Sequence, residues 1–229
     1  MRTVAVVIAV GLLIGCGRAD SSAPAGDARD APDARVAPEA VPKPAKPRIV
    51  FLGDSLTAGL GLSTDQSYPS LIGKKLKEQG YDYEIVNAGV SGDTSAGGSR
   101  RLDWSLEGDV RALVLALGAN DGLRGLPTDQ MKHNLELVLD RAKSRNIPVV
   151  LAGMEAPPNN GPDYTRAFRQ VYIDLAKEYD VRFVPFLLLG VAGNPSLNQG
   201  DGIHPNARGA EIVADLVWAE LEQLLRRPT

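Results

Sequence analysis

Five short segments dominated by apolar residues are spread along the chain and predict strands. They occupy residues 49–52, 83–86, 112–117, 149–152 and 183–186. Runs of this length without strict polar alternation are typical of strands that are buried on both faces of a parallel sheet. Pro185 has no amide hydrogen to donate to a neighbouring strand, so the last segment is expected at an edge of the sheet.

Helical patterns separate these segments, with apolar residues repeating at spacings of three and four. Helices are predicted over residues 68–79, 129–146, 163–179 and 206–225, and Thr128 is expected to cap the second of them. Alternating strands and helices predict a three-layer α/β/α architecture around a parallel sheet of five strands. In such sheets ligands bind beyond the carboxyl ends of the strands, so the residues that follow each strand are the candidate site.

The first 47 residues differ from this pattern and are expected to lie outside the domain. Residues 1–15 join a basic Arg2 to an apolar run over residues 4–14, which is shorter than the roughly 20 residues needed to span a bilayer. This is the pattern of a signal peptide. The run ends in LIGC, which resembles a bacterial lipobox and implies a diacylglycerol anchor on Cys16, the single cysteine. A plain secretory signal is the alternative.

Residues 16–47 read as a lipidated cysteine followed by a disordered tether. Between Gly17 and Pro47 there are 9 Ala, 6 Pro and no aromatic residue, and such a stretch cannot bury enough apolar surface to offset its ordering entropy. A single domain is then expected over residues 48–227. The expected location is the bacterial cell envelope, on the periplasmic side of the outer membrane because Gly17 rather than an acidic residue follows the cysteine; a secreted protein is the alternative.

Charge and composition exclude several classes of protein. With 25 basic and 28 acidic residues the net charge is -3, so no basic excess exists to bind nucleic acid. One cysteine rules out an internal disulfide and a metal site built from cysteines. The two histidines, His133 and His204, are too few for a multi-histidine metal centre, and no metal or cofactor is expected.

Polar residues stand where four of the predicted elements end or begin. Ser55 lies in GDSLTAG (residues 53–59), Gly89 in NAGVSGD (residues 87–93), Asn120 in GANDG (residues 118–122), and Asp201 and His204 in DGIHP (residues 201–205). Each string alone has a simpler explanation: a capping serine, a flexible turn, an Asx turn and a helix-capping histidine. A serine nucleophile needs a neighbouring base, and His204 is the candidate because His133 falls inside a predicted helix.

Together the four strings resemble the SGNH (GDSL) hydrolase superfamily, in the branch of bacterial thioesterase I/lysophospholipase and arylesterases. The resemblance implies a flavodoxin-like SGNH hydrolase fold and a catalytic triad of Ser55, His204 and Asp201. It also implies an oxyanion hole formed by the backbone N–H groups of Ser55 and Gly89 and by Nδ2 of Asn120. The implied reaction is hydrolysis of short- to medium-chain carboxylic esters, with lysophospholipids and thioesters as further candidate substrates.

The substrate crevice is expected beside Asn120 and in the loop after the fourth strand. Leu123 and Leu126 would offer apolar contacts, and Pro157 and Asn160 would line the other side. Glu155 and Asn160 depart from the pattern of the family. A monomer that acts on a small ester or lipid and is held to a membrane by its lipid is expected. The alternatives are an O-deacetylase of cell-envelope carbohydrate and a non-catalytic tethered binding lipoprotein.

Overall fold

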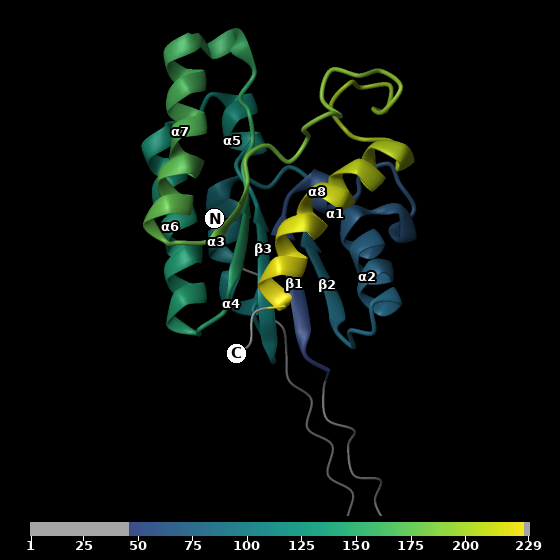
Figure 1. The fold of residues 1–229 in the computed structure, drawn as a ribbon. Coiled ribbons are helices and arrows are strands. Elements are labelled where there is room, and N and C mark those ends of the chain that lie inside the picture. Colours follow the sequence, from purple (N-terminus) through teal and green to yellow (C-terminus); the bar gives the residue numbers. More distant parts are fainter. Residues whose placement is uncertain (1–45, 227–229) are drawn as a thin grey trace, which may run out of the picture. The chain divides into compact units, whose positions relative to one another are not determined.

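A parallel sheet of five strands lies at the centre of residues 46–226, which are the residues described by the computed structural model (Figure 1). The strand order is β2-β1-β3-β4-β5, and every neighbouring pair is parallel. The prediction of a five-stranded parallel sheet with the last strand at an edge is therefore confirmed. The strands are β1 (Arg48–Gly53), β2 (Glu84–Gly89), β3 (Val110–Ala116), β4 (Val149–Ala152) and β5 (Arg182–Val184). The predicted signal peptide, lipidated cysteine and tether lie outside the described residues.

Continuous apolar sequence in the inner strands reflects burial on both faces of the sheet. Phe51 in β1, Leu113 in β3 and Val150 in β4 are completely buried. The edge strand β2 runs three residues beyond its predicted end, because its backbone stays paired with β1 as far as Gly89 opposite Gly53. Residues 87–89 therefore belong to a strand and not to the loop that the sequence predicted.

Helices cover both faces of the sheet (Figure 1). On one face α2 (Tyr68–Glu78) packs against α8 (Ala207–Leu225), and on the other α6 (Thr128–Ser144) packs against both α3 (Ser95–Arg100) and α7 (Pro162–Glu178). The four predicted helices are α2, α6, α7 and α8, each found within two residues of its expected ends. None of the helices in residues 46–226 is long and apolar enough to cross a membrane.

Short elements between the strands and the long helices were given no range by the sequence. They are α1 (Ser55–Ala58), α3, α4 (Leu102–Ser105), α5 (Ala119–Arg124), η1 (Thr64–Gln66) and η2 (Pro158–Asn160). The predicted cap of α6 was also wrong: the helix begins at Thr128 itself, Pro127 occupies the N-cap position, and no side-chain capping bond forms. Two of these elements, α1 and α5, lie directly after β1 and β3 and carry the candidate site residues.

Candidate active site

Ser55 is the first residue of α1, directly beyond the carboxyl end of β1. The Asp54 side chain caps this short helix by accepting a hydrogen bond from the N–H of Leu56 at 3.0 Å. Gly53 makes the sharp exit from the strand possible, since a Cβ there would lie 2.0 Å from Oγ1 of Thr57. The turn thus fixes the Ser55 hydroxyl at the edge of the sheet.

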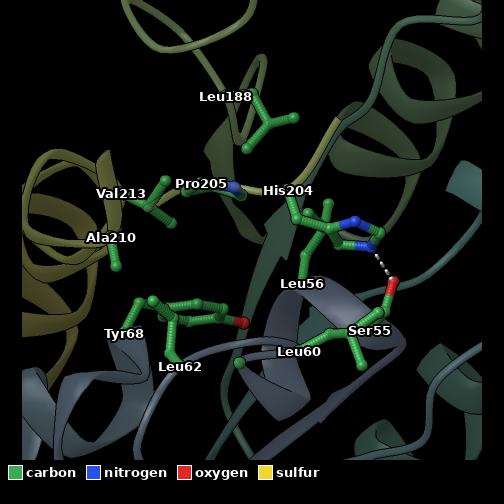
Figure 2. Close-up of a pocket in the computed structure, with 11 residues that line it drawn as sticks. Ser55, Leu56, Leu60, Leu62, Tyr68, Leu188, His204, Pro205, Ala210 and Val213 are labelled. Carbon is green, nitrogen blue, oxygen red and sulfur yellow. Dashed lines mark hydrogen bonds between the residues drawn. The ribbon is translucent and has the colours of Figure 1, made fainter. Parts of the chain in front are cut away.

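The structure brings Ser55, His204 and Asp201 together in series. Oγ of Ser55 lies 2.9 Å from Nε2 of His204, as Figure 2 shows, and Nδ1 of His204 lies 2.6 Å from Oδ2 of Asp201. The other Asp201 oxygen accepts the N–H groups of Ile203 and His204 at 2.9 and 3.0 Å. The hydrogen bond from the imidazole, followed by these two backbone bonds, holds the pKa of the Asp201 carboxyl well below its usual range. An ionised carboxylate therefore faces the imidazole.

His133 has no part in this arrangement. It lies on α6, its side chain is 69% exposed, and its nearest carboxylate is Glu136 at 4.0 Å. The structure therefore places only one of the two histidines beside a serine.

One glutamine side chain joins the serine side of the site to the histidine side. Nε2 of Gln199 donates to the carbonyl of Leu60, just beyond α1, at 2.7 Å, and to the carbonyl of Pro205 at 3.0 Å. The Gln199 backbone N–H also donates to the carbonyl of His204 at 2.8 Å. Sequence reasoning missed this residue, which no local pattern marks.

The structure does not support Gly89 as an oxyanion donor. Its N–H already donates to Oδ1 of Asn87 at 3.0 Å, and Gly89 does not line the cavity beside Ser55. It packs instead against α1, where a Cβ on Gly89 would lie 2.2 Å from the backbone nitrogen of Ala58. The glycine is thus required for close packing of β2 against the serine helix.

Gly92, three residues further on, lies at the cavity where Gly89 was expected. It lines the cavity together with Ser91, and its φ of +83° is the left-handed conformation that favours glycine. The carbonyl of Gly92 accepts a hydrogen bond from Nη2 of Arg124 at 2.9 Å. Within residues 46–226 neither the N–H of Gly92 nor that of Ser55 has a hydrogen-bond acceptor. Two backbone donors are therefore free at the cavity.

Asn120 supplies a third polar group in the cavity lining. It lies in the first turn of α5, whose N-cap Gly118 leaves room for the hydroxyl of Tyr172. Nδ2 of Asn120 donates to the carbonyl of Asp93 at 2.9 Å and makes a longer contact of 3.4 Å with Oδ2 of Asp54. A helix rather than the alternative Asx turn therefore presents this amide.

The cavity beside Ser55 and His204 has a volume of about 530 Å³ and mostly apolar walls. Leu60, Leu123 and Ile203 line it and are also about half exposed, so they form an apolar mouth. Pro157 lines the cavity as predicted, whereas Leu126 and Asn160 do not. Nδ2 of Asn160 instead donates to the carbonyl of Gly122 at 3.3 Å, which holds η2 against α5.

Behind the serine and histidine the packing is tight. Figure 2 shows Tyr68, Leu188 and Val213 around a small apolar space that Ser55 and His204 close on one side. Its volume is about 10 Å³, which is the size of a single water at most. The open cavity on the other side is therefore the one that can accept a substrate.

Asp54 carries an ionisable group in an almost fully buried position. Burial raises the pKa of its carboxyl from 3.8 to about 6, and the Leu56 N–H, the charge of His204 and the Asn120 amide offset only part of that rise. Across residues 46–226 no group of three or more His, Cys, Asp or Glu side chains is arranged to hold a metal ion.

A hydroxyl, an imidazole and a carboxylate in series, with free backbone N–H donors beside the hydroxyl, define the site of a serine hydrolase. A model of the GDSL-like lipase/acylhydrolase family matches residues 51–212. The chain belongs to this family.

Relatives with names and solved structures agree with this assignment. Esterase TesA of Pseudomonas aeruginosa is 43% identical over 178 residues, which are 77% of this chain and 89% of that protein. Thioesterase 1/protease 1/lysophospholipase L1 of Escherichia coli is 37% identical over 77% of this chain and 84% of its own length. The crystal structure of TesA superposes with a TM-score of 0.74 at 42% identity, covering 77% of this chain and 99% of that one. The predicted family, branch and fold are thereby confirmed.

Proposed function

We propose that this protein is a serine esterase that hydrolyses carboxylic esters through an acyl-enzyme on Ser55. The class of carboxylic ester hydrolase is confirmed by its relatives, which are named esterase, arylesterase and thioesterase/lysophospholipase. The observation that carries the role of Ser55 is its 2.9 Å contact with Nε2 of His204, which is itself bonded to Asp201.

The contacts define how protons move in each half of the reaction. His204 Nε2 accepts the Ser55 proton while Oγ forms a bond to the ester carbonyl carbon. It then gives that proton to the leaving oxygen as the carbon–oxygen bond breaks. Asp201 holds the imidazole in the required tautomer and stabilises its cationic form. Water, deprotonated by the same nitrogen, then releases the acid from Ser55.

The tetrahedral intermediate carries its negative charge on the former carbonyl oxygen, and we assign three donors from residues of the cavity lining to receive it. They are the free backbone N–H groups of Ser55 and Gly92 and the second amide hydrogen of Asn120, whose only contact is the long one to Asp54. A single donor of this kind typically contributes about 3–4 kcal/mol to transition-state stabilisation. Gly92 therefore replaces Gly89 in the oxyanion hole.

The shape of the cavity favours an ester with one apolar substituent. Its volume of about 530 Å³ lies within the usual range for small-molecule sites. Its walls offer Leu56, Leu123, Phe186 and Ile203 but few polar groups to bind a sugar. This supports short- to medium-chain alkyl or aryl esters over a carbohydrate O-acetyl group. The serine–histidine contact argues against a non-catalytic binding protein.

A lipid anchor on Cys16 is part of the same proposal. Its support is the apolar run over residues 4–14, followed by Gly15 and this cysteine in the string LIGC. Two acyl chains on one residue supply the affinity that stable membrane attachment requires. The hydrolase would then act in the bacterial cell envelope.

The test uses Ser55→Ala with His133→Gln as its control. The purified proteins are assayed with p-nitrophenyl esters from acetyl to palmitoyl, with lysophosphatidylcholine and with an acetylated sugar, and are treated with a fluorophosphonate probe. Loss of activity on the order of 10⁴-fold and loss of labelling are expected for Ser55→Ala alone. Retention of more than about a tenth of the activity would refute the role of Ser55.

A further inference from the structure

We propose that Arg101 is a positioning residue that holds the three donors of the oxyanion hole at their mutual distances. The inference rests on the proposed serine-esterase function. It concerns a residue that lies outside the cavity lining and touches no reacting atom.

The Arg101 guanidinium joins the carboxyl ends of two strands. Nη2 donates to the carbonyl of Gly53 at 2.8 Å, and Nη1 donates to the carbonyl of Ala88 at 2.7 Å. Gly53 ends β1 two residues before Ser55, and Ala88 is the penultimate residue of β2. One side chain therefore spans the point where β1 passes into the serine helix and the point where β2 passes into the Gly92 turn.

The third contact of Arg101 reaches the remaining donors through Asp93. Nε of Arg101 donates to Oδ2 of Asp93 at 2.7 Å. The Asp93 N–H donates to the carbonyl of Val90 at 3.0 Å, which closes the turn that contains Gly92. The Asp93 carbonyl accepts the hydrogen bond from Nδ2 of Asn120. Asp93 thus sets the place of both Gly92 and Asn120, and Arg101 sets the place of Asp93.

Burial and geometry make this a task for arginine. The side chains of Arg101 and Asp93 are 17% and 19% exposed, so the ion pair is largely shielded from water. A guanidinium presents donors in a fixed planar fork that can meet three acceptors at once, whereas a lysine ammonium is a point charge on a flexible stem. Because hydrogen-bond donors act on a transition state only when they are accurately placed, a displacement of about 1 Å can cost on the order of 10²-fold in rate.

Arg145 offers a matched control at the opposite end of the sheet. Its Nη1 and Nη2 also donate to backbone carbonyls, those of Leu106 and Gly108, in the segment before β3 begins at Val110. Arg145→Gln therefore removes hydrogen bonds to two backbone carbonyls, the contacts that Arg101 makes in addition to its ion pair with Asp93. These contacts lie at the amino end of β3, away from the carboxyl ends of the strands that carry the site.

The experiment compares Arg101→Lys, Arg101→Gln and Arg145→Gln in the full chain. Rates with p-nitrophenyl butyrate give kcat and KM, and a boronic acid, whose adduct with serine is tetrahedral, gives the affinity for a transition-state-like ligand. Arg101→Gln is expected to lower kcat and boronate affinity by about 10–100-fold with KM within about threefold. The kcat and boronate affinity of Arg101→Lys should lie between those of the wild type and those of Arg101→Gln. Arg145→Gln should lower the melting temperature while kcat and boronate affinity stay within about twofold.

Several outcomes would overturn the inference. One is an Arg101→Lys enzyme that folds and keeps the wild-type kcat and boronate affinity; this variant answers the question even if Arg101→Gln does not fold. Another is an equal loss of kcat in Arg145→Gln, which would show a general effect of stability. If Ser55→Ala keeps its activity the proposed function fails, whereas an inactive Ser55→Ala beside an unaffected Arg101→Lys refutes the positioning role alone.

Discussion

Asp54→Asn is expected to change how the stability of the protein depends on pH. The Asp54 carboxyl is 1% exposed, and burial raises its pKa from 3.8 to about 6. The folded protein thus holds this proton more tightly than the unfolded chain does. The stability that results is fully present below about pH 4 and is lost as the pH rises through about 6. A rise in pKa from 3.8 to about 6 amounts to about 3 kcal/mol.

Urea denaturation from pH 4 to pH 8 measures this effect directly. Asparagine keeps the cap on α1 because its side-chain oxygen can still accept the Leu56 N–H, but it has no proton to lose. The free energy of unfolding of the wild type, relative to Asp54→Asn, should therefore fall by about 2 to 3 kcal/mol over this range. Asp129→Asn, which removes an exposed carboxylate, is the control for loss of a surface charge. If the difference in free energy of unfolding between the wild type and Asp54→Asn stays constant with pH, the reasoning is refuted.

Three further substitutions test the site and the anchor. Asn120→Ala should lower kcat by about 10²–10³-fold with little change in KM, because an oxyanion donor acts mainly in the transition state; a change in KM alone would make Asn120 a substrate-binding residue. His204→Gln should be nearly inactive while His133→Gln keeps kcat/KM within about threefold, and equal losses would contradict the assignment of the base. Cys16→Ser should abolish palmitate labelling and membrane association without changing turnover, whereas an unlabelled wild type would favour a plain secreted esterase.

Elements with a long or continuous apolar pattern could be predicted from the sequence. The inner parts of β1 and β3 (residues 49–52 and 112–116) and all of β4 are buried, and these residues are apolar; the four long helices show one buried stripe each. The end of β2 could not be predicted in this way. Asn87 and Gly89 belong to the strand through backbone pairing with β1, and backbone pairing leaves no apolar pattern on an edge strand.

The candidate site shows the same division between local pattern and tertiary contact. Ser55, Asn120, Asp201 and His204 follow strands or precede a helix, positions that the sequence reveals. Gly89 and Gly92 stand in one short string, and the structure distinguishes them by the packing of Gly89 against α1 and by the place of Gly92 in the cavity lining. A signal for Gly92 was present, since it stands between Ser91 and Asp93 in a polar turn of the kind that favours a left-handed glycine.

Leu126 was misplaced for a related reason. The sequence suggested a loop after Asn120, but residues as far as Arg124 continue as α5. The helix turns Leu123 toward the cavity and leaves Leu126 beyond it, where its carbonyl accepts the hydroxyl of Tyr164 at 2.8 Å. The number of residues from Asn120 along the chain was therefore a poor guide to distance from the cavity.

The contact between Ser55 and His204 joins residues that are 149 positions apart in the chain. One follows the first strand and the other precedes the last helix, so the reactive pair forms only when α8 has docked beside α2. Ester hydrolysis during refolding should therefore appear late, after most of the helical circular dichroism signal has returned. A fragment that lacks the segment from Asp201 onward should be inert, and adding that segment as a separate peptide should restore turnover only as the two pieces associate.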